Sequence, residues 1–210
     1  MKRCKNMIWL AMLLLSMVTR QASAQEYFMP PKNVATPTVQ LHSNALYWLA
    51  LVPNVGVELQ TNSGLAFQLD YMGAWWNSSS HNHYYSCYGF QTDLRYYLGD
   101  TPQNTPFVGH HVGLYGQLMT YDFEFGGKGY QCANLFKTWG VGVAYGYVLP
   151  LTSRLSADFT IGIGYLSSRY TAYEPTPSWF RATSYGSWTY FGPTRLEATL
   201  VYNVNMFNNK

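Results

Sequence analysis

The stretch RLSADFTIGIGYL, from Arg154 to Leu166, alternates apolar residues with polar or small ones along its whole length. The first set is Leu155, Ala157, Phe159, Ile161, Ile163 and Tyr165, and the second is Ser156, Asp158, Thr160, Gly162 and Gly164. Successive side chains of a β-strand point to opposite faces of a sheet. A period of two therefore predicts a strand with one apolar and one polar face.

The same alternation recurs along most of the chain. It is clear in the segments Val55–Leu59, Leu65–Tyr71, Tyr88–Tyr96, Thr138–Leu149 and Arg195–Val204. Two further segments are less regular: Val112–Asp122 is a weaker strand, and Leu41–Val52 is either a first strand or a short helix on the periplasmic side. Counting both gives eight strands, an even number that places both termini on one side of a membrane barrel.

The composition favours a barrel surrounded by lipid over a water-soluble domain. Charged residues make up 11% of the chain and aromatic residues 18%, with 19 Tyr and 7 Trp. A soluble domain has about 25% charged residues. A barrel in a membrane needs an apolar exterior with aromatic residues at both interfaces. We therefore predict an all-β fold: a small antiparallel, up-and-down transmembrane β-barrel in the outer membrane.

The first 24 residues have the features of a secretory signal peptide. Lys2, Arg3 and Lys5 precede an apolar run from Met7 to Val18, and Ala22-Ser23-Ala24 supplies small residues for cleavage. We expect residues 25–40 to form an N-terminal periplasmic segment and residues 41–210 to form the barrel. Once four basic residues leave with the signal, the remaining nine nearly balance the ten acidic ones, and the formal charge of +3 does not indicate a nucleic-acid partner.

The predicted connections differ in length on the two sides. Residues 61–64, 99–107 and 150–153 form short or moderate turns, whereas residues 77–86, 124–136 and 168–188 are expected to be long outer loops. Short turns belong in the periplasm and long loops outside the cell. The short link at residues 53–54 departs from this pattern, because a long loop is expected there.

An eight-stranded barrel is filled by its own side chains. The polar face of the strands supplies a candidate interior network of Glu58, Asp70, Asp93, Arg95, Asp158, Arg195 and Glu197. Buried charges persist when they are paired and hydrogen-bonded. Asp158 and Glu197 could instead act as a general acid and base, but a filled small barrel needs polar residues whether or not it performs chemistry.

The histidines and cysteines give two local hypotheses. His81 and His83 could approach a metal from one loop, but no further ligand lies nearby, so we predict no metal site and no cofactor. His110 and His111 lie at a strand start, where one faces inward and the other outward. Cys87 and Cys132 lie in or beside the predicted outer loops, and they either form a disulfide in the oxidising envelope or remain two unpaired thiols.

Several tracts together resemble the DUF3575 family of Bacteroidetes outer-membrane proteins of unknown function. They are NALYWLALVPNVGVEL (residues 44–59), LDYMGAWW (69–76), GHHVGLYGQLMTYDFEFGGKGYQ (109–131), YEPTP (173–177) and YFGPTRLEATLVY (190–202). The resemblance implies a β-barrel envelope protein, and the occurrence of some relatives with fimbrial genes implies a link to surface fibres. It supplies no catalytic residues.

These observations predict a structural or surface-interaction protein rather than an enzyme. The expected partners are outer-membrane lipid and lipopolysaccharide, the machinery that inserts barrels, and fimbrial or other surface proteins. The alternative is an outer-membrane enzyme that deacylates lipid A or transfers an acyl chain to it. No nucleophile elbow or Ser/His spacing in the sequence supports that alternative.

Overall fold

The computed structural model describes residues 38–61, 64–78, 83–98, 108–125, 127–152, 154–175 and 180–204. Almost all of them lie in antiparallel strands. The elements are β1 (Thr38–Asn44), α2 (Ala45–Leu49), β2 (Asn54–Gln60), β3 (Leu65–Ser78), β4 (His83–Tyr97), β5 (Gly109–Phe125), β6 (Gly129–Cys132), η1 (Leu135–Lys137), β7 (Thr138–Pro150), β8 (Leu155–Pro175) and β9 (Phe180–Asn203).

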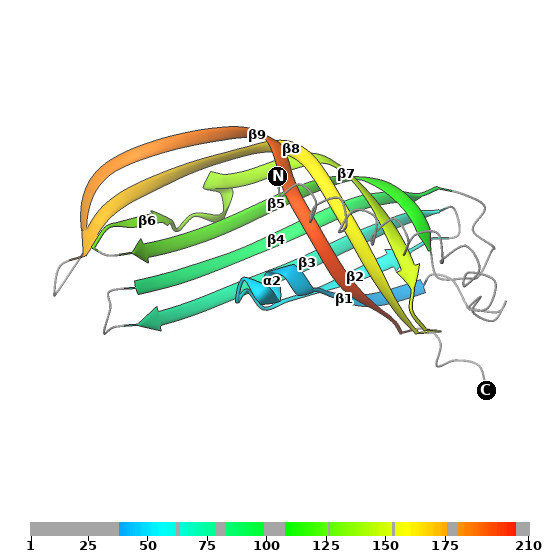
Figure 1. Cartoon of the computed structure of the whole chain (residues 1–210). Helices are drawn as coiled ribbons and strands as arrows, with labels where there is room; N and C mark the ends of the chain where they lie inside the picture. Colours follow the sequence, from blue (N-terminus) through cyan, green and yellow to red (C-terminus); the bar gives the residue numbers. More distant parts are fainter. Residues whose placement is uncertain are drawn as a thin grey trace, which may run out of the picture.

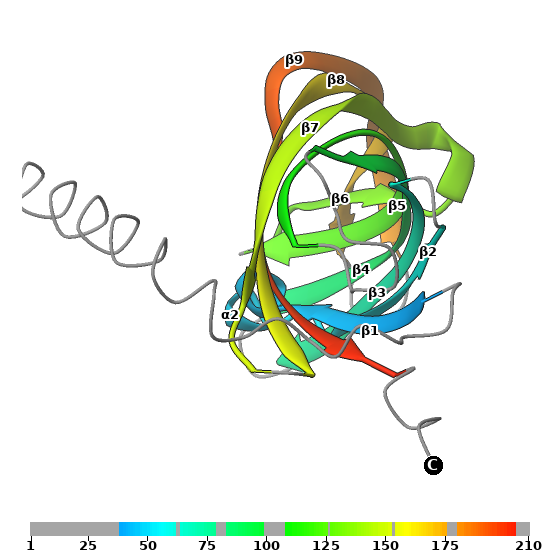
Figure 2. The ribbon, with the colours of Figure 1, turned by 90° about the vertical axis from the view of Figure 1, so that its right-hand side faces the viewer.

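Eight of these strands form a closed ring, as the alternation predicts. Each strand in the order β1, β2, β3, β4, β5, β7, β8 and β9 pairs with the next, and β9 pairs with β1 from Gln40↔Asn203 to Asn44↔Thr199. The view along the ring shows the closed wall (Figure 2). The additional strand β6 takes the place of β7 beyond Thr138, the first residue of β7, because it pairs there with both β5 and β8.

The two ends of the molecule differ. One end, here called the terminal end, holds the start of β1, the end of β9 and the turns that precede β3 and β8. At the opposite, hairpin end the hairpins β3–β4, β5–β6 and β8–β9 run far past α2 (Figure 1). A membrane strand needs about 9–11 residues, whereas β8 has 21 and β9 has 24. These hairpins are therefore long enough to project well beyond a membrane.

The wall has a notch on one side. β1 and β2 have only 7 residues each, and α2 joins them about half-way along the molecule (Figure 1). Asn44 caps this helix, since its side chain accepts a hydrogen bond from the Leu46 N–H at 3.0 Å. Beyond the notch the sheet is an open wall, with β9 at one edge and β3 at the other.

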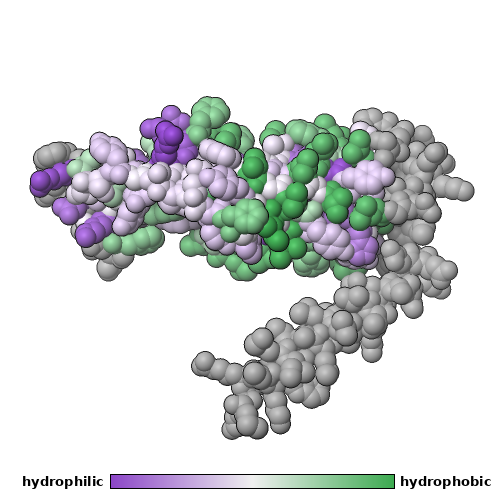
Figure 3. All heavy atoms as spheres, turned by 90° about the horizontal axis from the view of Figure 1, so that it is seen from above, coloured by the Kyte–Doolittle hydropathy of each residue, from purple (hydrophilic) through white to green (hydrophobic). Residues whose placement is uncertain are grey.

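The closed ring is polar inside and apolar outside. Buried polar and charged residues outnumber buried hydrophobic residues about two to one, and the outward side chains of the strands are mostly large, apolar and exposed. Hydrophobic residues gather on the part nearer the terminal end, and the hairpin end is mostly white to purple and therefore more hydrophilic (Figure 3). Such an exterior is suited to hydrocarbon. No helix among the described residues is long and apolar enough to cross a membrane.

Aromatic side chains mark both limits of the apolar exterior. On the terminal side they include Tyr96 and Tyr145, and toward the hairpin end they include Trp139 and Tyr165, whose ring centroids lie 5.6 Å apart. Beyond Tyr165 the outward residues of β8 become polar, beginning with Ser167 and Arg169. The apolar part of β8 thus has about the length that a membrane strand needs.

Several sequence expectations need correction. β1 begins at Thr38, three residues before the expected start of the barrel at residue 41. Thr38 and Gln40 are buried inward residues, so the sequence shows no apolar signal at the start of this strand. The tract Leu41–Val52 is both strand and helix, and α2 lies away from the terminal end. Most of the predicted long outer loops are hairpin strands. The proposed signal peptide lies outside the described residues.

An arginine placed in the apolar exterior should destabilise the barrel. Val143 points outward from β7 and is 58% exposed. We expect Val143→Arg to lower the free energy of unfolding from lipid vesicles by about 2–4 kcal/mol, because a charge in hydrocarbon loses its hydration. The control is Ser184→Arg on the exposed hairpin end of β9, which should change it by less than about 0.5 kcal/mol. Equal stability of the two variants would contradict a lipid-facing Val143.

Candidate functional site: the charged barrel interior and the open wall

The seven residues proposed from the sequence all lie on the inward side of the ring. Six are buried, with relative exposures of 6% or less, and the Asp70 side chain is 20% exposed. They come from five strands: Glu58 from β2, Asp70 from β3, Asp93 and Arg95 from β4, Asp158 from β8, and Arg195 and Glu197 from β9. The alternation places them there, because the neighbouring residues in the sequence mostly face outward. Thr194 is an exception, since it lies at a register shift of β9 and its hydroxyl contacts that of the inward Tyr115.

Arg95 organises the first of two ion clusters. Its Nη1 lies 3.1 Å from Glu58 Oε2 and 2.8 Å from Asp158 Oδ2. Tyr97 donates its hydroxyl to Glu58 Oε1 at 3.0 Å, and the Gln60 amide donates to the same oxygen at 2.8 Å. This cluster joins β2, β4 and β8 across the interior.

Arg195 organises the second cluster. It forms an ion pair with Asp93 through Nη1 and with Glu197 Oε2 through Nη2, the latter at 2.6 Å. Gln91 donates to the other oxygen of Glu197 at 2.8 Å, and the guanidinium carbon lies 5.2 Å from the centre of the Tyr115 ring. A cation over an aromatic face is stabilised by the ring electrons. This cluster ties β4 to β9 beside the notch.

Two histidines that the sequence reasoning did not assign belong to the interior. His111 Nε2 lies 3.0 Å from Asp158 Oδ1, and His42 Nε2 lies 2.5 Å from Asp70 Oδ1. Inward glycines make room for them, since a Cβ at Gly56 would collide with His42 and one at Gly146 with His111. The prediction that His110 and His111 face opposite sides is confirmed, and the same parity argument could have placed His42.

The interior is packed rather than open. Two cavities touch the clusters, and each holds about 10 Å³, which is about the space for one water molecule. The two arginines pair with four of the five carboxylates. His42 lies against the fifth, Asp70, and His111 lies against Asp158, which also pairs with Arg95. Asp158 and Glu197 belong to separate clusters, so the proposed acid and base are not paired with each other. In the described residues neither histidine hydrogen-bonds to a serine or cysteine.

Of the two alternatives left open for Cys87 and Cys132, the structure has the unpaired thiols, and both are buried. Tyr121 on β5 pairs with Cys87 on one side and with Cys132 on the other. The cysteines are therefore two strand spacings apart, or roughly 9–10 Å. Disulfides require Cα atoms within about 7 Å. Cys132 instead accepts a hydrogen bond from the Thr138 hydroxyl at 3.2 Å.

No metal site emerges from the described part of the chain. It contains no group of three or more His, Cys, Asp or Glu side chains that could hold an ion. His81 lies outside the described residues, as does the side chain of His83. The hypothesis of a histidine pair in that loop therefore stays a prediction.

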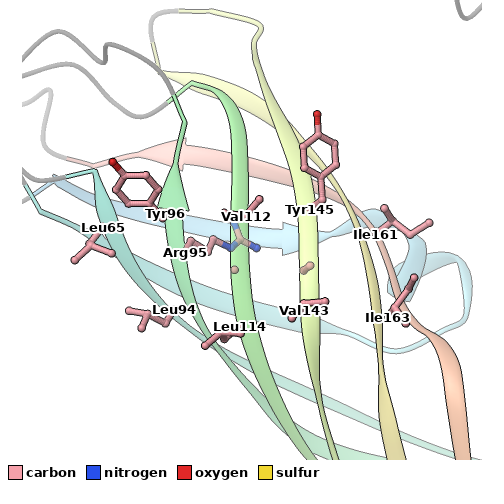
Figure 4. Close-up of a pocket in the computed structure, with 12 residues that line it drawn as sticks. Leu65, Leu94, Arg95, Tyr96, Val112, Leu114, Val143, Tyr145, Ile161 and Ile163 are labelled. Carbon is pink, nitrogen blue, oxygen red and sulfur yellow. The ribbon is translucent and has the colours of Figure 1, made fainter.

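A shallow apolar groove of about 650 Å³ crosses the outer face of five neighbouring strands, from β3 to β8. Two rows of outward side chains form its sides (Figure 4). One row includes Tyr96 and Tyr145, and the other includes Leu114 and Val143. Its floor is the wall itself at the inward positions Arg95, Gly113 and Ala144. The groove has the chemistry of a surface that contacts hydrocarbon chains.

In the open wall, a buried tyrosine fastens β8 to β5 across β6. Tyr173 donates its hydroxyl to Asp122 Oδ1 at 2.6 Å, and Gln131 donates to the other oxygen at 3.1 Å. Burial and the Asp122 carboxylate raise the pKa of Tyr173. Burial also raises the pKa of Asp122, although its two hydrogen bonds oppose that effect. The Tyr173 ring covers Gly129, where any side chain would collide with it.

The closed ring with a polar interior and the sequence tracts quoted above agree with a known family. The family model described as "Protein of unknown function (DUF3575)" matches residues 9–204. The chain belongs to this family. The crystal structure of Neisserial surface protein A (NspA) is similar to this DUF3575 protein with a TM-score of 0.38 and 16% sequence identity, over 80% of this chain and 96% of that one. No curated protein matches it.

Removing the Arg95 guanidinium should strongly destabilise the barrel. Arg95→Met leaves Glu58 and Asp158 buried without their cation, so we expect a loss of about 3–5 kcal/mol in the free energy of unfolding. A denaturant titration in detergent would measure it, with the exposed Arg169→Met as control. Adding Glu58→Gln to Arg95→Met should recover part of the loss. An Arg95→Met barrel as stable as the control would contradict the role of the pair.

Both thiols should be free in the purified protein. In denaturant without reductant, N-ethylmaleimide should modify the peptides that contain Cys87 and Cys132 completely, and mass spectrometry would show it. In the folded barrel the same modification should be slow, because both thiols are buried and only the exposed thiolate reacts readily. Labelling that appears only after reduction would contradict the arrangement.

Proposed function

We propose that this DUF3575 protein is an outer-membrane β-barrel that acts at the cell surface by pairing the open edge of β9 with a strand of another protein. Membrane barrels place their termini and short turns in the periplasm. The terminal end then faces the periplasm, and the hairpin end with its open wall faces outward. The plugged interior argues against a role as a pore, because paired charges fill it.

The observation that carries this proposal is the long open edge of β9. Within the described residues, β1 pairs with β9 only from Thr199 to Asn203, and residues 180–198 pair with β8 alone. Pairing ends cleanly at the notch, where the Ala198 N–H donates to the Asn44 side chain. An open strand edge presents backbone N–H and C=O groups to which another chain can add.

The sequence of this edge supports pairing with a partner. Edges that must not pair are commonly protected by charges. Between residues 181 and 191 β9 carries one charge, Arg181, and ten uncharged residues, which are mainly Ser, Thr, Tyr and Gly. Both faces of this segment are exposed apart from the partly covered Gly186. The edge therefore suits an extended partner segment that gains main-chain hydrogen bonds on one side.

We extend the proposal to surface fibres, with a fimbrial subunit as the partner. Subunits of that kind present extended segments that complete a sheet. The fimbrial link and the origin in Bacteroidetes both come from the family resemblance of the sequence, and they stay predictions. The plugged interior and the apolar belt support only the coarser proposal of a surface barrel.

A photoreactive amino acid on β9 tests the edge in living cells. Placed at Ser184 or Ser187, which lie on opposite faces of the strand, it should produce one defined adduct that contains a fibre subunit. The matched control is Ile161, which faces outward from the neighbouring β8 and is 53% exposed in the apolar belt. It should yield no such adduct. Thr189→Lys should reduce the adduct at least several-fold, because a charge disfavours strand addition.

Separate measurements test the membrane location, the fimbrial partner and the alternative of a lipid-modifying enzyme. Outer-membrane fractionation and heat-modifiable migration should identify a folded barrel, and recovery as a soluble periplasmic protein would contradict the membrane assignment. A deletion strain with unchanged fibres and no subunit adduct would contradict the fimbrial partner. Altered mass of lipid A in the deletion strain would instead favour a lipid-modifying enzyme.

A further inference from the structure

A polar pocket of about 680 Å³ lies on the outer face of the open wall. It is formed where the wall passes from β6 to β7, and η1 makes one of its sides. The chain between these strands stands out beyond the outline of the barrel (Figure 2). The opposite side is formed by Arg169, Tyr170 and Thr171 of β8 and by Tyr185 and Gly186 of β9.

Two cations from different elements line this pocket. Lys137 ends η1, and Arg169 lies on the outward face of β8. Both side chains are exposed, and neither forms an ion pair with an acidic residue in the described part of the chain. Arg95 and Arg195 in the barrel interior, by contrast, form ion pairs with carboxylates. Lys137 and Arg169 are therefore available to an anion that the protein itself does not supply.

The remaining lining suits a ligand with both polar and apolar parts. Gln131 and Asn134 add amide groups to the lining, although one Gln131 N–H already donates to Asp122 Oδ2 and Asn134 Oδ1 accepts from the Phe136 N–H. Phe136 and Tyr185 are 75% and 81% exposed. Aromatic rings that keep an exposed face can pack against the apolar face of a sugar or an acyl chain. The lining itself contains no carboxylate, and the neighbouring Asp122 already accepts hydrogen bonds from Tyr173 and Gln131.

The position of the pocket indicates the source of the anion. Lys137 comes two residues before Trp139 of β7, and Arg169 comes four residues after Tyr165 of the adjacent β8. Trp139 and Tyr165 pack together at the hairpin-side limit of the apolar belt. Aromatic residues at such a limit lie at the level of lipid headgroups. The two cations thus lie directly outside the membrane interface, at the height where outer-leaflet phosphates occur.

We propose that this pocket binds the phosphate of an outer-leaflet glycolipid, with Lys137 and Arg169 as its ligands and the lipid chains on the apolar belt below. Arginine forms paired hydrogen bonds with phosphate oxygens, and lysine acts as a point charge. The inference rests on the proposed membrane orientation, because the opposite orientation would place the pocket in the periplasm. It does not depend on the open edge of β9.

The test uses the full mature protein in neutral detergent micelles. The probes are bisphosphorylated lipid A, the same lipid after removal of its phosphates, and inorganic phosphate, with binding followed by native mass spectrometry. We expect the phosphorylated lipid to bind the parent protein at least tenfold more tightly than the dephosphorylated one. Lys137→Gln with Arg169→Gln should abolish that preference. The control, Lys128→Gln with Arg181→Gln, removes equal charge from exposed sites elsewhere on the open wall and should retain it.

Each other result overturns a defined part of the proposal. Equal binding of the two lipids by the parent protein would show that phosphate is not recognised. If the control variant also lost the preference, general attraction between the protein's charges and phosphate would explain the binding, and the pocket would not. If inorganic phosphate competed as strongly as the lipid, the ligand of the pocket would be free phosphate and the glycolipid proposal would be rejected. Heat-modifiable migration of every variant shows separately that the barrel is folded, so a failed membrane assignment is distinguishable from a failed pocket.

Discussion

Hydrogen bonds between β1 and β9 close the sheet, and the rest of the structure depends on that closure. In hydrocarbon every backbone N–H and C=O group needs a partner within the protein. The five paired positions from Gln40↔Asn203 to Asn44↔Thr199 provide it at the seam. Closure also creates an interior too narrow for anything except side chains. The charges of that interior must then pair with one another, as Arg95 and Arg195 do.

The wall changes character where closure ends. Beyond Asn44 and Asn54 the sheet loses β1 and β2, and the side chains of these two asparagines satisfy the last backbone groups of the seam. Six strands of the ring continue past this point as an open wall, and the outward face of β8 turns from apolar to polar further along, after Tyr165, which pairs with Phe191. An open edge is costly in lipid but is solvated in water. The edge of β9 from residue 181 to residue 189 lies beside the polar part of β8, where water can solvate it.

The sequence predicts the closed ring well because each of its strands has one face in hydrocarbon and one in a polar interior. Parity alone places Asp93 and Arg95 inside and Leu94 and Tyr96 outside. The open wall was mistaken for loops, because both faces of β9 are exposed there and no alternation marks it. A five-residue helix such as α2 has no periodic signal, and its start depends on Asn44. The state of the cysteines stayed open for a different reason, because sequence distance cannot show that Tyr121 separates Cys87 from Cys132.

Two cations of the barrel interior and two of the open wall show how position determines the role of a charge. Arg95 and Arg195 are buried, and the desolvation of each guanidinium requires nearby carboxylates, so they are structural. Lys137 and Arg169 carry the same charge just past the aromatic limit, where water already solvates them. No internal carboxylate is required there, and the described structure pairs them with none. A cation that folding does not need, held on a polar pocket beside lipid headgroups, is more readily explained by a ligand than by stability. The same reasoning assigns the interior charges to folding and the outer charges to recognition.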